Sequence, residues 1–245
     1  MNKIIFEKIR FSNITLKDLP EILKKNGLFL FPSAPGLASI KKQINYYNSL
    51  KQADYVFFDS SFFVFLLRIF KNIKCHRFSG YTFFNFFLKY LGNKKNTSLF
   101  LIDPKIKFSN NNKKLIKNIG VKSKNINNYI APIYNPSNLK DLKLLKLLKK
   151  NRPKIILINI GGGTQEVLGL YLKKNLKFKC KIICTGAAIS FFTKDQAPIN
   201  DFIDKNYIGW LVRFLFNPIT FGSRLIYAFK LIKIVINGKV KNVSY

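Results

Sequence analysis

The sequence is poor in cysteine and histidine, which excludes two common kinds of stabilising site. Its three cysteines, Cys75, Cys180 and Cys184, do not form the framework of a disulfide-rich secreted protein. The single histidine, His76, has no partners at the spacings typical of zinc sites. Cys180 and Cys184 flank a short apolar run, so we expect both to be buried in the core. These features favour a reducing, cytoplasmic setting.

Long uncharged apolar runs are also missing. A membrane-spanning helix requires roughly 18–20 such residues. The closest candidates are residues 55–70, interrupted by Asp59 and Arg68, and residues 208–236, interrupted by four basic residues. The first residues lack the apolar stretch and the small-residue cleavage site of a signal peptide. We therefore expect neither a spanning helix nor a secretory signal.

Acidic residues are scarce: 11 Asp and Glu stand against 43 Lys and Arg, for a formal net charge of +32. Such a chain is attracted to polyanions, including nucleic acid, anionic lipid and phosphorylated substrates. The alternative is that the net charge has no binding role. The composition is biased towards Lys, Asn, Ile and Phe, and lysines on helix faces are usually solvated. Specific nucleic-acid binding is the weakest interpretation, because RRM, zinc-finger and helix-turn-helix signatures are absent.

Short apolar runs alternate with longer amphipathic segments in a chain that is 48% hydrophobic. The alternation predicts an α/β fold with a Rossmann-like parallel sheet and flanking helices, in which ligands bind beyond the carboxyl ends of the strands. We expect strands at residues 28–34, 53–59, 98–103, 155–160 and 181–185. We expect helices at residues 36–50, 60–70, 80–91, 113–119, 137–150 and 165–175, and two more after Pro198.

The chain divides by composition into a core and a basic tail. Residues 1–200 are expected to form the α/β core, and the Asn- and Lys-rich residues 93–128 to include surface loops. Residues 201–245 are expected to form a basic, amphipathic helical appendage that breaks at Asn217-Pro218. Trp210 and several Phe and Leu accompany four basic residues here, which suits an interface rich in anionic lipid. Ordinary packing helices with solvated lysines are the alternative.

Asp59 ends the very apolar segment YVFFD. A carboxylate at the carboxyl end of a strand is well placed in a cleft to act as a general base. The alternative is that Asp59 only caps the helix that follows.

Three glycines, Gly161, Gly162 and Gly163, join an expected strand to an expected helix. Glycine lets the backbone approach a ligand closely, and a helix N-terminus favours an anion. The segment is neither a Walker loop nor a GxGxxG motif, so a tight turn explains the glycines equally well. Gln165 and Glu166 lie in the first turn of the expected helix. Gln165 can hydrogen-bond a sugar or base, whereas Glu166 suits the helix dipole even without a binding role.

Several short motifs follow one another in a recognisable order. The later ones are GGGTQE at residues 161–166, GAAISFF at 186–192, QAP at 196–198, GWLVR at 209–213 and NPITFGSR at 217–224. The earlier and looser ones are FPS at residues 31–33, ADYVFFDS at 53–60 and RFSGYT at 77–82. This order and spacing, over about residues 28–235, resemble the bacterial WecG/TagA/CpsF glycosyltransferase family.

The resemblance implies an inverting transfer of N-acetylmannosamine or a related sugar. The donor is a UDP-sugar, and the acceptor is linked to polyprenyl diphosphate in surface polysaccharide or teichoic-acid-type biosynthesis. It implies no metal or other cofactor, and a cytoplasmic location, peripheral on the inner face of the cell membrane. Homo-oligomerisation stays open.

The resemblance also implies a set of site residues. Asp59 matches the catalytic base, and Arg213 and Arg224 match arginines that hold the donor's diphosphate. Further matched positions expected to bind substrate are Ser33, Arg77, Gly80, Gly161, Gly162, Gln165, Glu166 and Gly186.

Some positions depart from the family pattern. Ser190, Gln196, Gly209 and Asn217 stand where the family carries charged side chains. These replacements leave a second hypothesis open, a non-catalytic member that binds nucleotide sugar, lipid or a partner enzyme.

Overall fold

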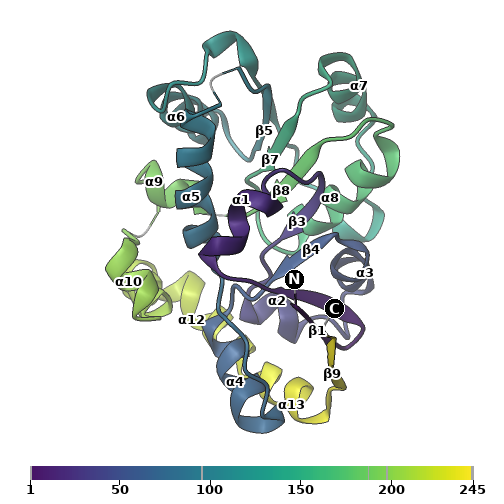
Figure 1. The fold of residues 1–245 in the computed structure, drawn as a ribbon, viewed down its shortest axis with the longest axis vertical. Helices are drawn as coiled ribbons and strands as arrows, with labels where there is room; N and C mark the ends of the chain where they lie inside the picture. The colour runs from purple at the N-terminus through teal and green to yellow at the C-terminus, as the bar shows by residue number, and fades with distance from the viewer. Residues whose placement is uncertain (1, 95, 187, 197, 244–245) are drawn as a thin grey trace.

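The computed structural model describes residues 2–94, 96–186, 188–196 and 198–243, and a nine-stranded sheet forms their centre (Figure 1). The strands lie in the order β6-β5-β7-β8-β3-β4-β2-β1-β9. Their bounds are β1 (Asn2–Phe6), β2 (Ile9–Asn13), β3 (Gly27–Leu30), β4 (Tyr55–Phe57), β5 (Leu99–Asp103), β6 (Ile126–Ile130), β7 (Ile155–Ile158), β8 (Lys181–Cys184) and β9 (Val240–Val243). The strands from β6 to β2 pair in parallel, which confirms the predicted α/β fold.

Helices flank this sheet and bury both of its faces. Along β3, Leu28 and Leu30 enter one core while Phe29 enters the other, as the two-residue period of a strand requires. Cys180 and Cys184 are buried as predicted. The helices are α1 (Leu19–Ile22), α2 (Ala34–Ala38), α3 (Ile44–Gln52), α4 (Ser61–Lys71), α5 (Gly80–Gly92), α6 (Ile106–Asn118), α7 (Leu142–Asn151), α8 (Thr164–Asn175), α9 (Ala188–Phe192), α10 (Asp201–Lys205), α11 (Gly209–Phe216), α12 (Pro218–Ala228) and α13 (Lys230–Asn237).

The connections of two neighbouring strands, β5 and β7, leave in opposite directions. β5 connects outward to β6, and β7 connects to β8 on its other side. Two neighbouring parallel strands whose connections leave in opposite directions open a crevice at their carboxyl ends. The topology therefore places a binding crevice beyond β5 and β7.

The C-terminal segment returns to the sheet. α13 packs against α4, and the Phe229 and Phe62 rings meet at 5.8 Å. β9 then pairs antiparallel with β1, so both chain ends lie together in Figure 1. The expectation of an entirely helical tail is wrong for Val240–Val243, because the free edge of β1 offers backbone partners to these residues. The boundary at residue 200 stays a prediction.

Other differences have local causes. The helix expected at residues 36–50 is two helices, α2 and α3, with the Ser33 hydroxyl capping α2. The helix expected at residues 113–119 begins at Ile106 instead, as α6. Its first turns escaped prediction because α6 buries the polar residues Ser109 and Asn112 beside Ile116 and so lacks an apolar stripe.

Among the described residues, no helix is long and apolar enough to cross a membrane.

Candidate active site

A cleft of about 740 Å³ opens at the carboxyl ends of the parallel strands. Segments that follow β3, β4, β5, β7 and β8 line it, and α11 and α12 close one side. The predicted site residues in its lining are Ser33, Asp59, Gly80, Gly161, Gly162, Gln165, Glu166, Gly186, Arg213 and Arg224. Arg77 is the predicted site residue outside that lining. Ala187 and Ala197, within two of the sequence motifs, lie outside the described residues.

Asp59 lies just beyond β4 and faces the cleft. The following helix, α4, is capped by Ser60, whose Oγ accepts from the Phe63 N–H at 3.1 Å. Asp59 Oδ1 accepts instead from the Gly80 N–H, at the first turn of α5, at 2.7 Å. The alternative that Asp59 only caps α4 is therefore wrong.

The surroundings of Asp59 make its carboxylate a stronger base. Burial raises the pKa of Asp59 above its usual value, against the opposing effects of the Gly80 N–H and the Arg77 and Arg213 guanidinium groups. A carboxyl with a raised pKa takes a proton from a hydroxyl more readily than an exposed one does.

The glycine run forms an open floor of the cleft. A Cβ atom added at Gly161 or Gly162 would meet nothing within 4 Å, so a ligand can approach this backbone. Gly163 has φ +91°, a conformation that glycine adopts without strain, and it is the N-cap residue of α8. The Glu166 carboxylate accepts from the Gly163 N–H at 2.7 Å and so caps its own helix.

Gln165 connects α8 to the loop after β8. Its Oε1 accepts from the Gly186 N–H at 2.8 Å, and its Nε2 donates to Glu166 Oε1 at 3.1 Å. Gly186 has φ +59°, which a side chain would strain. Burial raises the pKa of Glu166 to about 7. Gln165 and Glu166 thus hold the site's backbone in place, and a ligand role for either stays a prediction.

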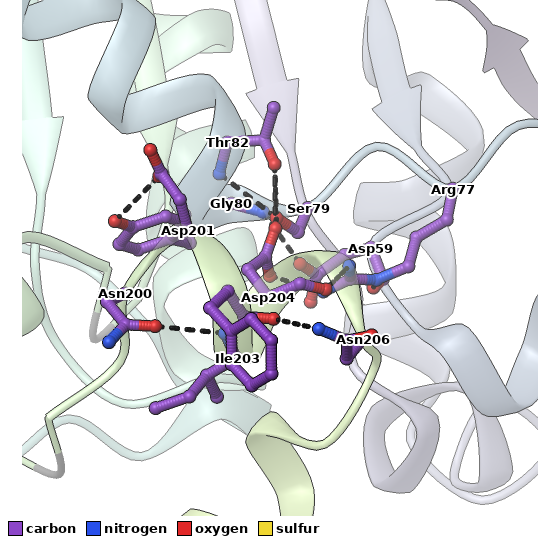
Figure 2. Close-up of polar contacts among 12 residues, drawn as sticks. Asp59, Arg77, Ser79, Gly80, Thr82, Asn200, Asp201, Ile203, Asp204 and Asn206 are labelled. Carbon is purple, nitrogen blue, oxygen red and sulfur yellow. Dashed lines mark hydrogen bonds and ion pairs between the residues drawn. The ribbon is translucent and has the colours of Figure 1, made fainter.

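Arg77 reaches Asp204 of α10 (Figure 2) and is not among the residues that line the cleft. Its Nη1 donates to the Asp204 carbonyl at 2.7 Å, and its Nη2 donates to Asp204 Oδ1 at 2.5 Å. The hydroxyls of Ser79 and Thr82 both donate to Asp204 Oδ2 at 2.8 Å. Asp204 carried no sequence signal, since it lies 127 residues from its partner and belongs to no motif.

Arg213 extends from α11 into the cleft. Its guanidinium lies over the Phe191 ring, 4.8 Å from the centroid. Its Nε is buried without a hydrogen-bond partner among the described residues. Burial lowers the pKa of Arg213, and Asp59 opposes that effect, while guanidinium remains charged at any physiological pH. Arg224 lines the same side from α12.

A second carboxyl terminates β5. Asp103 is fully buried and accepts hydrogen bonds from Asn112 and Asn159, both of which line the cleft. Sequence reasoning located this strand but assigned no role to its last residue, although the rule that singled out Asp59 applies to it equally. No cluster of three or more His, Cys, Asp or Glu that could hold a metal occurs within the described ranges.

A crevice at the strand-order reversal, a carboxyl at a strand end and a glycine-rich helix start are together typical of α/β proteins that bind phosphorylated ligands. The chain matches the model of the glycosyl transferase WecG/TagA/CpsF family over residues 4–243, so it belongs to this family. The resemblance drawn from the motifs is thereby confirmed, and glycosyl transfer is the general role. Comparison with curated proteins finds no match.

Proposed function

We propose that this chain is an inverting glycosyltransferase that moves a sugar from a UDP-sugar to a polyprenyl-diphosphate-linked acceptor. The sugar is N-acetylmannosamine or a related one. One observation carries the proposal: Asp59, the glycine floor and Arg213 line a single cleft. Family membership supports the reaction type, and the cleft supplies groups suited to each end of the reacting bond.

Asp59 is the proposed base. An acceptor hydroxyl has a high pKa, so a carboxylate must take its proton as the oxygen attacks. The attacking oxygen forms a bond to the anomeric carbon from the face opposite UDP, and the carbon–oxygen bond to UDP breaks, which inverts the centre. The proton passes to Asp59, and the bonding electrons leave with the diphosphate.

Arg213 is the proposed partner of the leaving group. Negative charge grows on the diphosphate as the bond breaks, and a guanidinium stabilises it by hydrogen bonds to phosphate oxygens. The unpartnered Nε of Arg213 leaves donor capacity for such a ligand. Arg224 lies on the same side, and the N-terminus of α8 adds favourable backbone N–H groups. Transfer without a metal or other cofactor remains part of the proposal.

The C-terminal helices are the proposed membrane contact, on the inner face of the cell membrane. Large apolar side chains are exposed on α11 and α12, with Leu215 at 71% and Ile219 at 88%. Exposed basic residues lie nearby, including Arg224 and Lys230. Such a combination binds an interface rich in anionic lipid and would bring the cleft to a lipid-linked acceptor.

A non-catalytic role is the second candidate. Ser190, Gln196 and Asn217 line the cleft and are uncharged, although the resemblance leads one to expect charged groups there. Such a protein would bind nucleotide sugar without turning it over.

The two candidates are separated by binding followed by turnover. Calorimetry with a panel of UDP-sugars identifies a donor that binds. UDP release is then measured with that donor and a polyprenyl-diphosphate-linked saccharide in anionic vesicles. Acceptor-dependent UDP release supports the transferase. Binding with no release across the panel supports the non-catalytic member. Absence of binding contradicts the transferase and leaves only a non-catalytic member that binds lipid or a partner enzyme.

A further inference from the structure

A buried polar cluster lies on the β5 and β7 side of the cleft, and the proposed reaction does not use it. Asp103 ends β5, Asn112 lies on α6 and Asn159 directly follows β7. Their exposed fractions are 0%, 2% and 9% respectively. Asn112 and Asn159 also line the cleft, so the cluster is buried yet adjoins the space that a ligand would occupy.

The hydrogen bonds inside the cluster leave only acceptors unused. Nδ2 of Asn112 and Nδ2 of Asn159 both donate to Asp103 Oδ1, at 2.7 Å each. These bonds orient the two amides, so each remaining Oδ1 can only accept. Asp103 Oδ2 and both amide Oδ1 atoms have no partner among the residues that the structure describes. The cluster is therefore complementary to a group that carries hydrogen-bond donors.

The chemistry of the cluster selects a neutral donor. An unpartnered carboxylate oxygen repels a phosphate, whereas it accepts strongly from an O–H or N–H group. A divalent cation fits less well, because Ca²⁺ takes 6–8 oxygen ligands and Mg²⁺ needs near-octahedral geometry. The cluster offers one carboxylate, and one of its oxygens already accepts from two amides.

The position of the cluster fits an elongated ligand. Asp59 follows β4 and Asp103 ends β5, and the strands between them in the sheet are β3, β8 and β7. Four steps between neighbouring strands correspond to about 19 Å at roughly 4.8 Å each. A ligand that reacts at Asp59 and also reaches Asp103 must carry polar rings far apart, as a nucleotide sugar does.

We propose that Asp103, Asn112 and Asn159 form a subsite that accepts hydrogen bonds from hydroxyl or N–H groups of a ring in the donor substrate. The inference rests on the proposed function, because it takes the ligand to be a nucleotide sugar. Because the transferred sugar reacts beside Asp59, about 19 Å away by the spacing of the strands, the ring is that of the nucleoside. The positively charged side of the cleft, around Arg213 and Arg224, then receives the diphosphate.

The test compares ligand affinities of matched asparagine variants. Asn159→Ala and Asn112→Ala each remove one cleft-lining acceptor, and Asp103→Asn changes the carboxyl with little change in shape. Asn175→Ala is the control, because Asn175 lies at the end of α8 outside the cleft lining and donates to the Tyr171 carbonyl at 2.7 Å. Calorimetry with the UDP-sugar, UDP and uridine is run well below each variant's melting temperature. The fitted stoichiometry reports the fraction of folded protein.

Asn159→Ala and Asn112→Ala should weaken binding of the UDP-sugar about tenfold, while Asn175→Ala should change it less than about twofold. The same loss is expected with UDP and with uridine, since both carry the nucleoside. A loss confined to the UDP-sugar would overturn the nucleoside subsite.

Wild-type affinity in both variants would overturn the subsite and leave the proposed function standing. Failure of every UDP-sugar to bind the wild type would overturn both. The subsite is also overturned if Mg²⁺ alone raises the melting temperature of the wild type and not of the two variants, because the cluster is then a cation site.

Discussion

Arg77 and Asp204 form a two-point contact that joins the parallel core to α10. The guanidinium binds both the carbonyl and the carboxylate of Asp204, and the two side chains are only 14% and 9% exposed. Arg77 also lies over the Tyr207 ring at 5.1 Å. The contacts of Arg77 thus hold α10, the start of the C-terminal segment, against the core. A direct role of Arg77 in binding substrate stays a prediction.

Breaking this pair should loosen the C-terminal segment. Asp204→Ala removes the carboxylate that accepts from Arg77 Nη2 and from the Ser79 and Thr82 hydroxyls. The free energy of unfolding should therefore fall by about 3 kcal/mol in denaturant titrations. Asp201→Ala on the same helix is the matched control, because Asp201 makes only exposed hydrogen bonds to Tyr81 and Asn85. Its cost should stay below about 1 kcal/mol. Equal losses in the two variants would show that the pair adds nothing specific.

Glu166 should make stability depend on pH. Burial raises its folded-state pKa from 4.5 to about 7, so the folded chain holds this proton more tightly than the unfolded chain does. Its stabilising contribution is complete below pH 4.5 and is lost as the pH rises through about 7.

Across that window, wild type should lose roughly 3 kcal/mol of stability relative to Glu166→Gln. Unfolding titrations at a series of pH values measure the difference. The exposed Glu21→Gln substitution serves as control and should track wild type. Parallel curves for wild type and Glu166→Gln would mean that Glu166 is ionised in the fold without penalty.

The glycine floor gives a prediction that separates binding from folding. Gly161→Val places its side chain in open space, so stability should change by less than about 0.5 kcal/mol while affinity for the UDP-sugar falls about tenfold. Gly169→Ala is the converse control. Its Cβ would meet Leu28 Cδ1 at 2.7 Å and Cys184 Sγ at 2.9 Å, which should cost about 1–3 kcal/mol without changing donor contacts. Unchanged donor affinity in Gly161→Val would leave the glycines as a turn only.

The membrane contact is tested with charge on the exposed apolar surface. Leu215→Glu combined with Ile219→Glu should reduce co-sedimentation with anionic vesicles at least fivefold, because two apolar contacts are lost and two negative charges are added. Ile133→Glu changes an equally exposed isoleucine elsewhere on the molecule and should bind vesicles nearly as wild type does. Vesicle binding that survives the double substitution would locate the contact outside α11 and α12.

The central strands and the helix after the glycines could be read from the sequence because their signals are local. Residues 155–158 form a continuous apolar run, and the glycines mark the turn that follows. Asp59 was found for the same reason. β1, β2 and β9 could not be found, since each is short and carries Lys, Arg or Asn, and their stability comes from pairing between the two ends of the chain.

Polar contacts between distant segments were also beyond the sequence. Arg77 has the spacing of a binding motif, but its partner lies in α10, and no periodicity links the two. Asn112 likewise looked like part of a polar loop, because a helix that buries polar residues against Asp103 leaves no apolar stripe. The sequence thus predicted Asp59 at one strand end and missed Asp204 and Asn112, the helix residues that bind Arg77 and Asp103.

The most direct test of the account is sugar transfer by Asp59→Asn. The substitution keeps the shape of the side chain and removes the base, so UDP release with donor and lipid-linked acceptor should fall by about 100-fold to 10,000-fold. Donor affinity and melting temperature should stay close to wild type, because the amide oxygen can still accept from the Gly80 N–H. An Asp59→Asn enzyme that transfers sugar at the wild-type rate would contradict Asp59 as the base and with it the proposed mechanism.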